Sequence, residues 1–122
     1  IYQVDEVDLG ITDVDMILTF RNAHNFTAET RGSINRAAFA ALKSGGVYGI
    51  VDHTKRHMEP ASDWTWRRLD PVLVIHEAVQ AGFVFETFSN VHARAEDELK
   101  YDTRHDSLVN ESDRFTLKFR KP

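Results

Sequence analysis

The feature that most constrains the fold of this chain is a short apolar run that ends abruptly in polar residues. The run Met16-Ile17-Leu18 has neither helical nor alternating polarity. Such a run is typical of a strand that is buried on both faces of a parallel sheet. In open α/β sheets, ligands bind at the carboxyl ends of the strands. The segment therefore predicts both a parallel sheet and the edge of a binding site. Four polar side chains follow the predicted strand directly: Arg21, Asn22, His24 and Asn25.

The first half of the chain predicts a strand, a helix and a second strand. Residues 31–43 carry apolar side chains at i, i+3 and i+4 spacing, which predicts an amphipathic helix after the strand at 14–20. We expect Gly45-Gly46 to end that helix and residues 47–51 to form the next strand. This order makes a βαβ unit, which is right-handed in nearly all proteins. Residues 2–7 are expected to form a short strand or a strand end.

The second half predicts another helix and two more strands. Asp70 is a suitable N-cap and Pro71 a suitable first helical residue, and Gly82 marks the end of this helix. Residues 83–88 read as a third strand. Residues 114–120 alternate between apolar and polar side chains, which is typical of a half-buried antiparallel strand. We expect this last strand to pair with its predecessor.

Length and composition limit the possible classes of protein. The 122 residues suffice for a single domain, 1–122. The net charge is −4 without a long basic run, so we expect no nucleic-acid partner. No apolar stretch is long enough to cross a bilayer, so we expect no membrane partner. Cysteine is absent, which excludes disulfides and thiolate chemistry and leaves the compartment open, the cytoplasm being slightly favoured.

Two stretches of the chain have residue patterns that are similar to those of a known family. Residues 5–9, Asp-Glu-Val-Asp-Leu, precede the strand that starts with 14–17, and residues 41–47, Ala-Leu-Lys-Ser-Gly-Gly-Val, precede the next strand. They resemble the acidic loop before the fourth strand and the turn before the fifth strand of class I S-adenosylmethionine-dependent methyltransferases. The resemblance implies an α/β fold with a Rossmann-like three-layer sheet, of which this chain is a part. Its antiparallel last strand would be inserted beside the fifth.

Three narrower stretches resemble one branch of that family. They are residues 19–25, 49–53 and 111–119, and together they look like a bacterial group of predicted methyltransferases with an Arg-Asn-x-His-Asn signature. The family's first strand and glycine-rich cofactor loop have no counterpart here and would lie upstream of Ile1. The resemblance therefore implies the carboxyl-terminal part of a methyltransferase with a truncated or processed amino terminus. We expect the chain alone to be inactive.

The resemblance also assigns candidate cofactor-binding residues. Asp5 would accept a hydrogen bond from the adenine amino group, and the backbone of Glu6 would face the adenine ring. A solvated acidic turn is an equal alternative for Asp5, because carboxylates are usually exposed. Arg21 and Asn22 would lie where the fourth strand opens over the cofactor. The implied cofactor is S-adenosylmethionine, with half of its site in this chain.

Three residues are candidates for catalysis. His24 is the candidate general base, since an imidazole titrates near neutral pH. Asp52 and His53 end the neighbouring strand. A carboxylate beside an imidazole would raise the pKa of His53 and fix its tautomer. Arg21 would either orient an anionic substrate group or pair with Asp52.

Substrate-binding and metal-binding residues are less sharply indicated. Asn25 is a candidate for substrate contact because it follows the strand end. Trp64, with Trp66, would form an aromatic lid, although such residues more often cover a core edge. His53 and His57 are four residues apart, but the local polarity predicts a loop rather than a helix, so we expect no metal site.

The leading hypothesis is S-adenosylmethionine-dependent methyl transfer to a small molecule, as part of a larger enzyme. One alternative is a non-catalytic assembly or binding module that lacks the cofactor loop. Another is a histidine-dependent hydrolase, for which the chain lacks a nucleophile elbow. In the family the first strand pairs with the fourth, so residues 16–20 would form an exposed apolar edge that tends to pair with another chain. We therefore expect either a homo-oligomer or a missing amino-terminal half as partner. The leading hypothesis also implies a small-molecule substrate.

Overall fold

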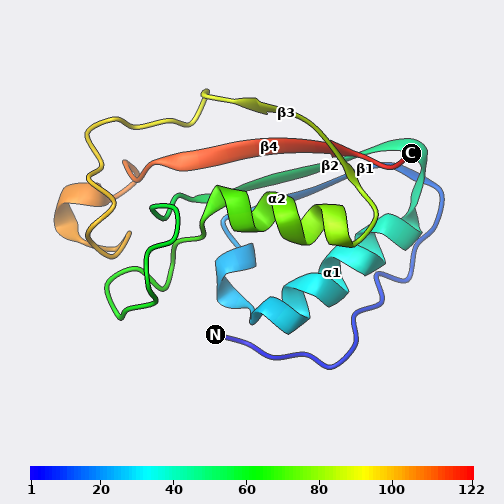
Figure 1. Cartoon of the computed structure of the whole chain (residues 1–122), viewed down its shortest axis with the longest axis horizontal. Coiled ribbons are helices and arrows are strands. Elements are labelled where there is room, and N and C mark those ends of the chain that lie inside the picture. Colours follow the sequence, from blue (N-terminus) through cyan, green and yellow to red (C-terminus); the bar gives the residue numbers. More distant parts are fainter.

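The computed structural model describes residues 1–122 as one four-stranded sheet with two helices packed against it (Figure 1). Single 3-10 turns occupy Ala23–Asn25 and Asp106–Leu108. Neither α-helix has the length and apolar character that crossing a membrane requires. The strands and helices are β1 (Val14–Phe20), α1 (Ala28–Ala41), β2 (Leu42–His53), α2 (Pro71–Gln80), β3 (Val84–Ser89) and β4 (Arg114–Arg120).

The strand order in the sheet is β1-β2-β4-β3. Strands β1 and β2 are parallel and are joined by α1, as the βαβ pattern predicts. Strand β4 runs antiparallel to both of its neighbours and lies between β2 and β3. This is the position implied by the resemblance for the last strand, so the predicted class is confirmed as a mixed α/β sheet that forms part of a Rossmann-like fold.

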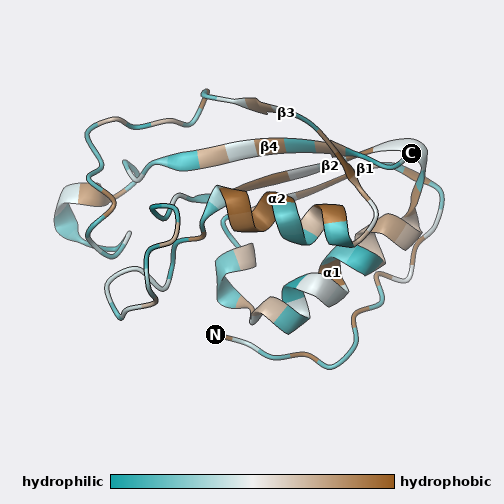
Figure 2. Ribbon diagram, in the orientation of Figure 1, coloured by the Kyte–Doolittle hydropathy of each residue, from teal (hydrophilic) through white to brown (hydrophobic).

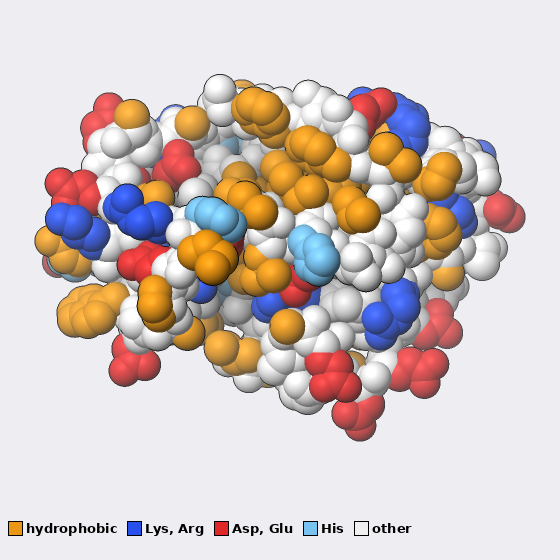
Figure 3. All heavy atoms as spheres, in the orientation of Figure 1, with side chains coloured by type: hydrophobic (Ala, Val, Ile, Leu, Met, Phe, Trp, Pro, Cys, Tyr) orange, Lys and Arg blue, Asp and Glu red, His pale blue; other side chains and the backbone are white.

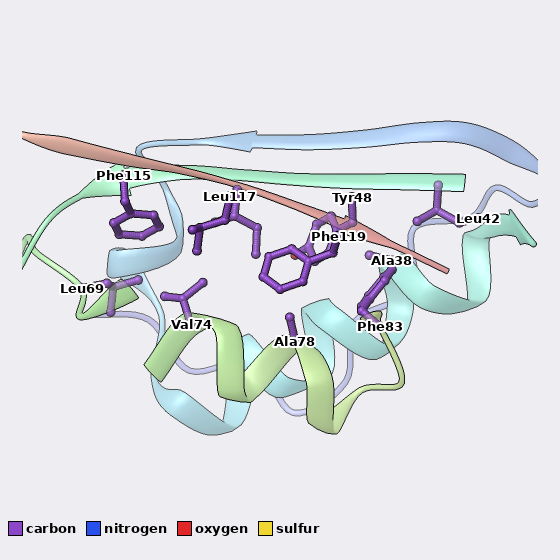
Figure 4. Packing of buried hydrophobic residues seen from close by; sticks show 11 residues of the cluster. Ala38, Leu42, Tyr48, Leu69, Val74, Ala78, Phe83, Phe115, Leu117 and Phe119 are labelled. Atoms are coloured by element: carbon purple, nitrogen blue, oxygen red, sulfur yellow. The ribbon is translucent and has the colours of Figure 1, made fainter. Parts of the chain in front are cut away.

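Both helices cover the same face of the sheet (Figures 1 and 4). Phe119 and Tyr48 point from the sheet toward Ala38 of α1 and Ala78 of α2, and all four are at least 98% buried (Figure 4). The chain therefore contains two layers of the three-layer arrangement. The opposite sheet face has no helix over it within residues 1–122. Its β1 side chains are largely exposed: Met16 (54%), Leu18 (50%) and Phe20 (57%).

The exposed side chains correct the prediction that β1 is buried on both faces. A continuous apolar run shows that a strand is suited to burial on both faces. It does not show that residues 1–122 themselves form a layer over each face. Apolar side chains also gather over α2 and β3 on the face seen in Figure 3, and both elements carry brown segments in Figure 2. On these two elements, Phe88 of β3 is 61% exposed and Val72 of α2 is 52% exposed.

The boundaries of α1 differ from the prediction at both ends. The helix starts at Ala28, because the side chain of Thr27 accepts a hydrogen bond from Thr30 N and caps it. It stops at Ala41, before the glycine pair, and β2 begins immediately. Gly45-Gly46 therefore lies within an irregular start of β2, where a Cβ on the second glycine would stand 2.8 Å from a backbone oxygen.

Two further sequence predictions have opposite outcomes. Asp70 caps α2 by accepting a hydrogen bond from Val72 N at 2.9 Å, with Pro71 as the first helical residue, as predicted. The predicted strand at 2–7 is wrong. That segment makes only an isolated bridge at Tyr2, and it runs along α1 through hydrogen bonds to hydroxyl groups of the helix.

Candidate functional site

A cleft of about 680 Å³ opens at the carboxyl ends of β1 and β2. Its walls come from the 3-10 turn after β1 and from the loops 54–70 and 90–113, which lie at the left end of Figure 1. A cleft of this size suits a small molecule. The polar cluster after β1 predicts this location, because parallel strands end together at one edge of a sheet. The side chains on which its chemistry depends are Arg21, His24, His53, Trp66 and Arg114.

The best-defined group in the cleft is a buried pair formed by Asp52 and His24. Asp52 is completely buried at the end of β2, and one of its oxygens lies 2.7 Å from Nδ1 of His24. The backbone N–H groups of His24 and His53 donate to the same carboxylate at 3.0 and 2.7 Å. Because a carboxylate only accepts, Nδ1 of His24 carries the proton, and Nε2 is left with its lone pair free. This arrangement suits a general base.

His53 lies beside the pair without sharing the Asp52 carboxylate through its ring. Its Nδ1 lies 2.6 Å from Oγ of Ser112, and its ring centroid lies 5.5 Å from that of His24. Burial lowers the pKa of His53 to about 4, against the opposing attraction of Asp52. Asp52 acts in the predicted direction, but burial and the nearby cationic side chains outweigh it, so the pKa of His53 falls instead of rising. His53 is neutral at pH 7.

The low pKa of His53 makes the stability of the fold depend on pH. An unfolded histidine titrates near 6.5, whereas folded His53 titrates at about 4, so between these values only the unfolded chain binds the proton. Stability is therefore full above the unfolded value and falls as the pH drops toward the folded one, by on the order of 3 kcal/mol in total. Urea unfolding at about pH 7 and about pH 4.5 measures this loss. The variant His53→Asn should show a clearly shallower pH dependence; an unchanged one would contradict the assignment.

Metal binding at the same place would compete with hydrogen bonds that take up most of the accepting capacity of Asp52. The ligand-capable atoms of His24, Asp52 and His53 lie within 4.8 Å of one another. However, the Asp52 oxygens already accept three hydrogen bonds. His57 does not join the group, since its Nδ1 lies 2.7 Å from the carboxylate of Asp70. The arrangement favours proton transfer over metal coordination.

The four residues predicted to bind the cofactor are not brought together. Asp5 and Glu6 are exposed and line another cavity, against α1. Arg21 lines the cleft, and Asn22 lines a separate apolar cavity of about 300 Å³ between the sheet and the helices. These residues therefore line three different cavities of residues 1–122.

The residues predicted to contact the substrate also lie in different places. Asn25 lines the cleft. Trp64 is 62% exposed and lies outside it, and Trp66 takes the place expected for the lid, with its ring 6.2 Å from that of His24. Sequence reasoning missed Arg114, although a signal for it exists: an antiparallel last strand must start where its parallel neighbour ends. The pairing of Arg114 with His53 in the sheet shows this.

Comparisons with known proteins identify the fold. No protein-family model matches the chain, and no curated protein matches it. Solved structures do match. A methyltransferase from Mesorhizobium loti described as S-adenosylmethionine-dependent has a TM-score of 0.64 at 14% identity, over 98% of this chain and 67% of that one. A TehB-like S-adenosylmethionine-dependent methyltransferase from Corynebacterium glutamicum has a TM-score of 0.63 at 14% identity, over 95% and 52%.

A further match is the [4+2]-cyclase SpnF, with a TM-score of 0.70 at 16% identity, over 94% of this chain and 53% of that one. The chain thus spans between half and two thirds of the length of these three structures. The chain therefore contains part of the fold of the class I S-adenosylmethionine-dependent methyltransferases. Likeness at this level of identity defines the fold and leaves the chemistry to the site.

Proposed function

We propose that this chain is the acceptor-binding part of an S-adenosylmethionine-dependent methyltransferase that acts on a small molecule. The observation that carries the proposal is the Asp52–His24 pair at the carboxyl ends of two parallel strands, in a fold whose solved neighbours include such enzymes. Ligands of open α/β sheets bind at this edge. A buried carboxylate that holds an imidazole in one tautomer suits removal of a proton from a nucleophile.

The chain's own residues would prepare the acceptor. Nε2 of His24 removes the proton from an alcohol, phenol or protonated amine, and Asp52 stabilises the resulting imidazolium through Nδ1. Trp66 and the guanidinium of Arg67, stacked 4.1 Å from its ring centroid, form a wall that reduces the access of water. When bound, S-adenosylmethionine supplies the activated methyl group. In this proposal residues outside the cleft hold it.

The bare face and edge of β1 support a second part of the proposal, a partner that completes the sheet. β1 is an edge strand with three exposed apolar side chains, and such edges tend to pair with another chain. The partner is either a second copy of this chain or an amino-terminal half that carries the cofactor loop. The matched structures contain the additional length that such a half requires.

Calorimetric titration with S-adenosylhomocysteine tests the proposal, using the protein encoded by the complete reading frame. We expect saturable binding by that protein, and binding should survive His24→Asn, because His24 is assigned to the acceptor. Sedimentation of residues 1–122 alone should show self-association, and Phe20→Lys should abolish it by placing a charge on the bare face. Absence of heat from the complete protein would refute the methyltransferase assignment. A monomer of residues 1–122 would leave the amino-terminal half as the partner.

A further inference from the structure

The cleft is strongly cationic although the chain as a whole is acidic. Four arginines line it, and no aspartate or glutamate does, whereas the net charge of the chain is −4. One of the four, Arg67, is neutralised by the carboxylate of Asp102. The other three form no ion pair: Arg21, Arg104 and Arg114. An uncompensated cationic pocket in an acidic protein concentrates anions.

Arg114 has a polar atom that the protein leaves without a partner. Its Nε is buried, and no protein group accepts a hydrogen bond from it. Burial and the neighbouring guanidinium groups of Arg21 and Arg94 lower the pKa of Arg114, which shows how poorly its charge is compensated. A buried donor left unsatisfied destabilises the folded state. Native structures rarely retain such a donor, so the protein itself compensates the Arg114 guanidinium only in part.

Arg21 is held in place at the expense of backbone strain. Its φ is +51°, in the left-handed region that residues other than glycine rarely adopt. Its backbone N–H donates to Val51 O at 2.7 Å, which fixes it at the end of the sheet. The alternative in which Arg21 pairs with Asp52 is wrong, because backbone groups and His24 occupy that carboxylate. Strain of this kind gathers at ligand-binding positions.

We propose that the cleft binds the anionic group of its small-molecule ligand, a carboxylate or a phosphate, between the guanidinium groups of Arg21 and Arg114. The assignment of this ligand as the methyl acceptor rests on the proposed function. Arginine suits both anions because its planar fork donates two parallel hydrogen bonds. With the anion held there, the remainder of the ligand lies against Trp66 and faces the free Nε2 of His24. The acceptor is therefore a small acid that carries its nucleophile close to the acidic group.

Fluorescence of Trp66 provides a direct test without cofactor. The chain has two tryptophans, and Trp64→Phe removes the exposed one outside the cleft, so Trp66 becomes the sole reporter. Benzoate and phenyl phosphate are the anionic probes, and benzamide is a neutral probe of similar shape. We expect saturable quenching by at least one anion, and binding of benzamide at least about tenfold weaker. Which anion binds more tightly distinguishes a carboxylate from a phosphate ligand.

Matched variants separate anion binding from folding. Arg114→Gln and Arg21→Asn should each weaken anion binding at least about tenfold while unfolding normally, since asparagine tolerates the left-handed backbone. Arg36→Gln removes the same charge from α1, outside the cleft, and should bind like the parent. Equal binding of benzoate and benzamide, no response to any probe, or unchanged binding by both cleft variants would overturn the proposal. S-adenosylhomocysteine binding plays no part here, so the two proposals can fail independently.

Discussion

Replacing Asp97 by alanine is expected to lower the free energy of unfolding by about 3–5 kcal/mol, because it leaves a buried arginine without its counterion. The side chains of Asp97 and Arg68 are both completely buried, and their two hydrogen bonds measure 2.8 and 3.0 Å. Arg68 also donates to the backbone oxygens of Thr54 and Tyr101. Asp97 accepts from the backbone N–H of Asp113 at 2.7 Å. The pair thus joins the two loops that wall the cleft.

Urea unfolding of Asp97→Ala beside two comparison variants checks this expectation. Asp15→Asn removes an exposed ion pair with Lys43 and should change stability by less than about 1 kcal/mol. The double variant Arg68→Met with Asp97→Leu replaces the pair by apolar side chains and should lose less stability than Asp97→Ala alone. A loss for Asp97→Ala no larger than that for Asp15→Asn would show that the two loops are held by other contacts.

The positions of the main elements and of the catalytic candidates follow from local patterns in the sequence. The cap at Asp70 and the alternation over 114–120 are short-range signals, and both elements form where they indicate. His24, Asp52 and His53 meet because each ends or follows one of two strands that run parallel and side by side. For such residues, strand order suffices to predict proximity.

The parts that sequence reasoning missed depend on long-range pairing. Arg68 and Asp97 lie 29 residues apart in irregular loops, and nothing in the spacing of either residue indicates the other. The stretch 90–112 is charged and has no periodic pattern, yet Asp97 and Ser112 within it are buried as partners of Arg68 and His53. Hydrogen bonds between loops follow from tertiary geometry, which local periodicity does not encode.

The exposure of β1 was missed for a different reason. The run Met16-Ile17-Leu18 is apolar throughout, so both faces of the strand are suited to apolar contacts. Ile17 packs against the core, while its two neighbours face the bare side of the sheet. Burial of these two side chains would need a covering layer on that face, which residues 1–122 do not provide.

Asp52→Asn, at the centre of the candidate site, is expected to lower the free energy of unfolding about as strongly as Asp97→Ala does in the walls of the cleft. The Asp52 carboxylate accepts from Nδ1 of His24 and from two backbone N–H groups, at 2.7 to 3.0 Å. An amide has one accepting oxygen and would turn its NH₂ group toward at least one of these donors. We expect a loss of about 3 kcal/mol in unfolding free energy, since each buried donor left unpaired costs about 1–3 kcal/mol.

The tautomer of His24 provides a second measurement. A loss of packing alone would not change this tautomer, so it reports on the role of the Asp52 carboxylate. In the parent chain, nitrogen NMR of the neutral imidazole should show a protonated Nδ1 and a bare Nε2, because the carboxylate holds the Nδ1 proton. In Asp52→Asn this preference should weaken or reverse. His24→Gln serves as the matched variant, since it removes the ring but keeps the backbone N–H that donates to Asp52. It should lose about half as much stability as Asp52→Asn, because only the side-chain hydrogen bond is removed. If the two variants were equally destabilised and the tautomer of His24 did not change in Asp52→Asn, the carboxylate would serve the fold alone, and His24 would lose its assignment as the base.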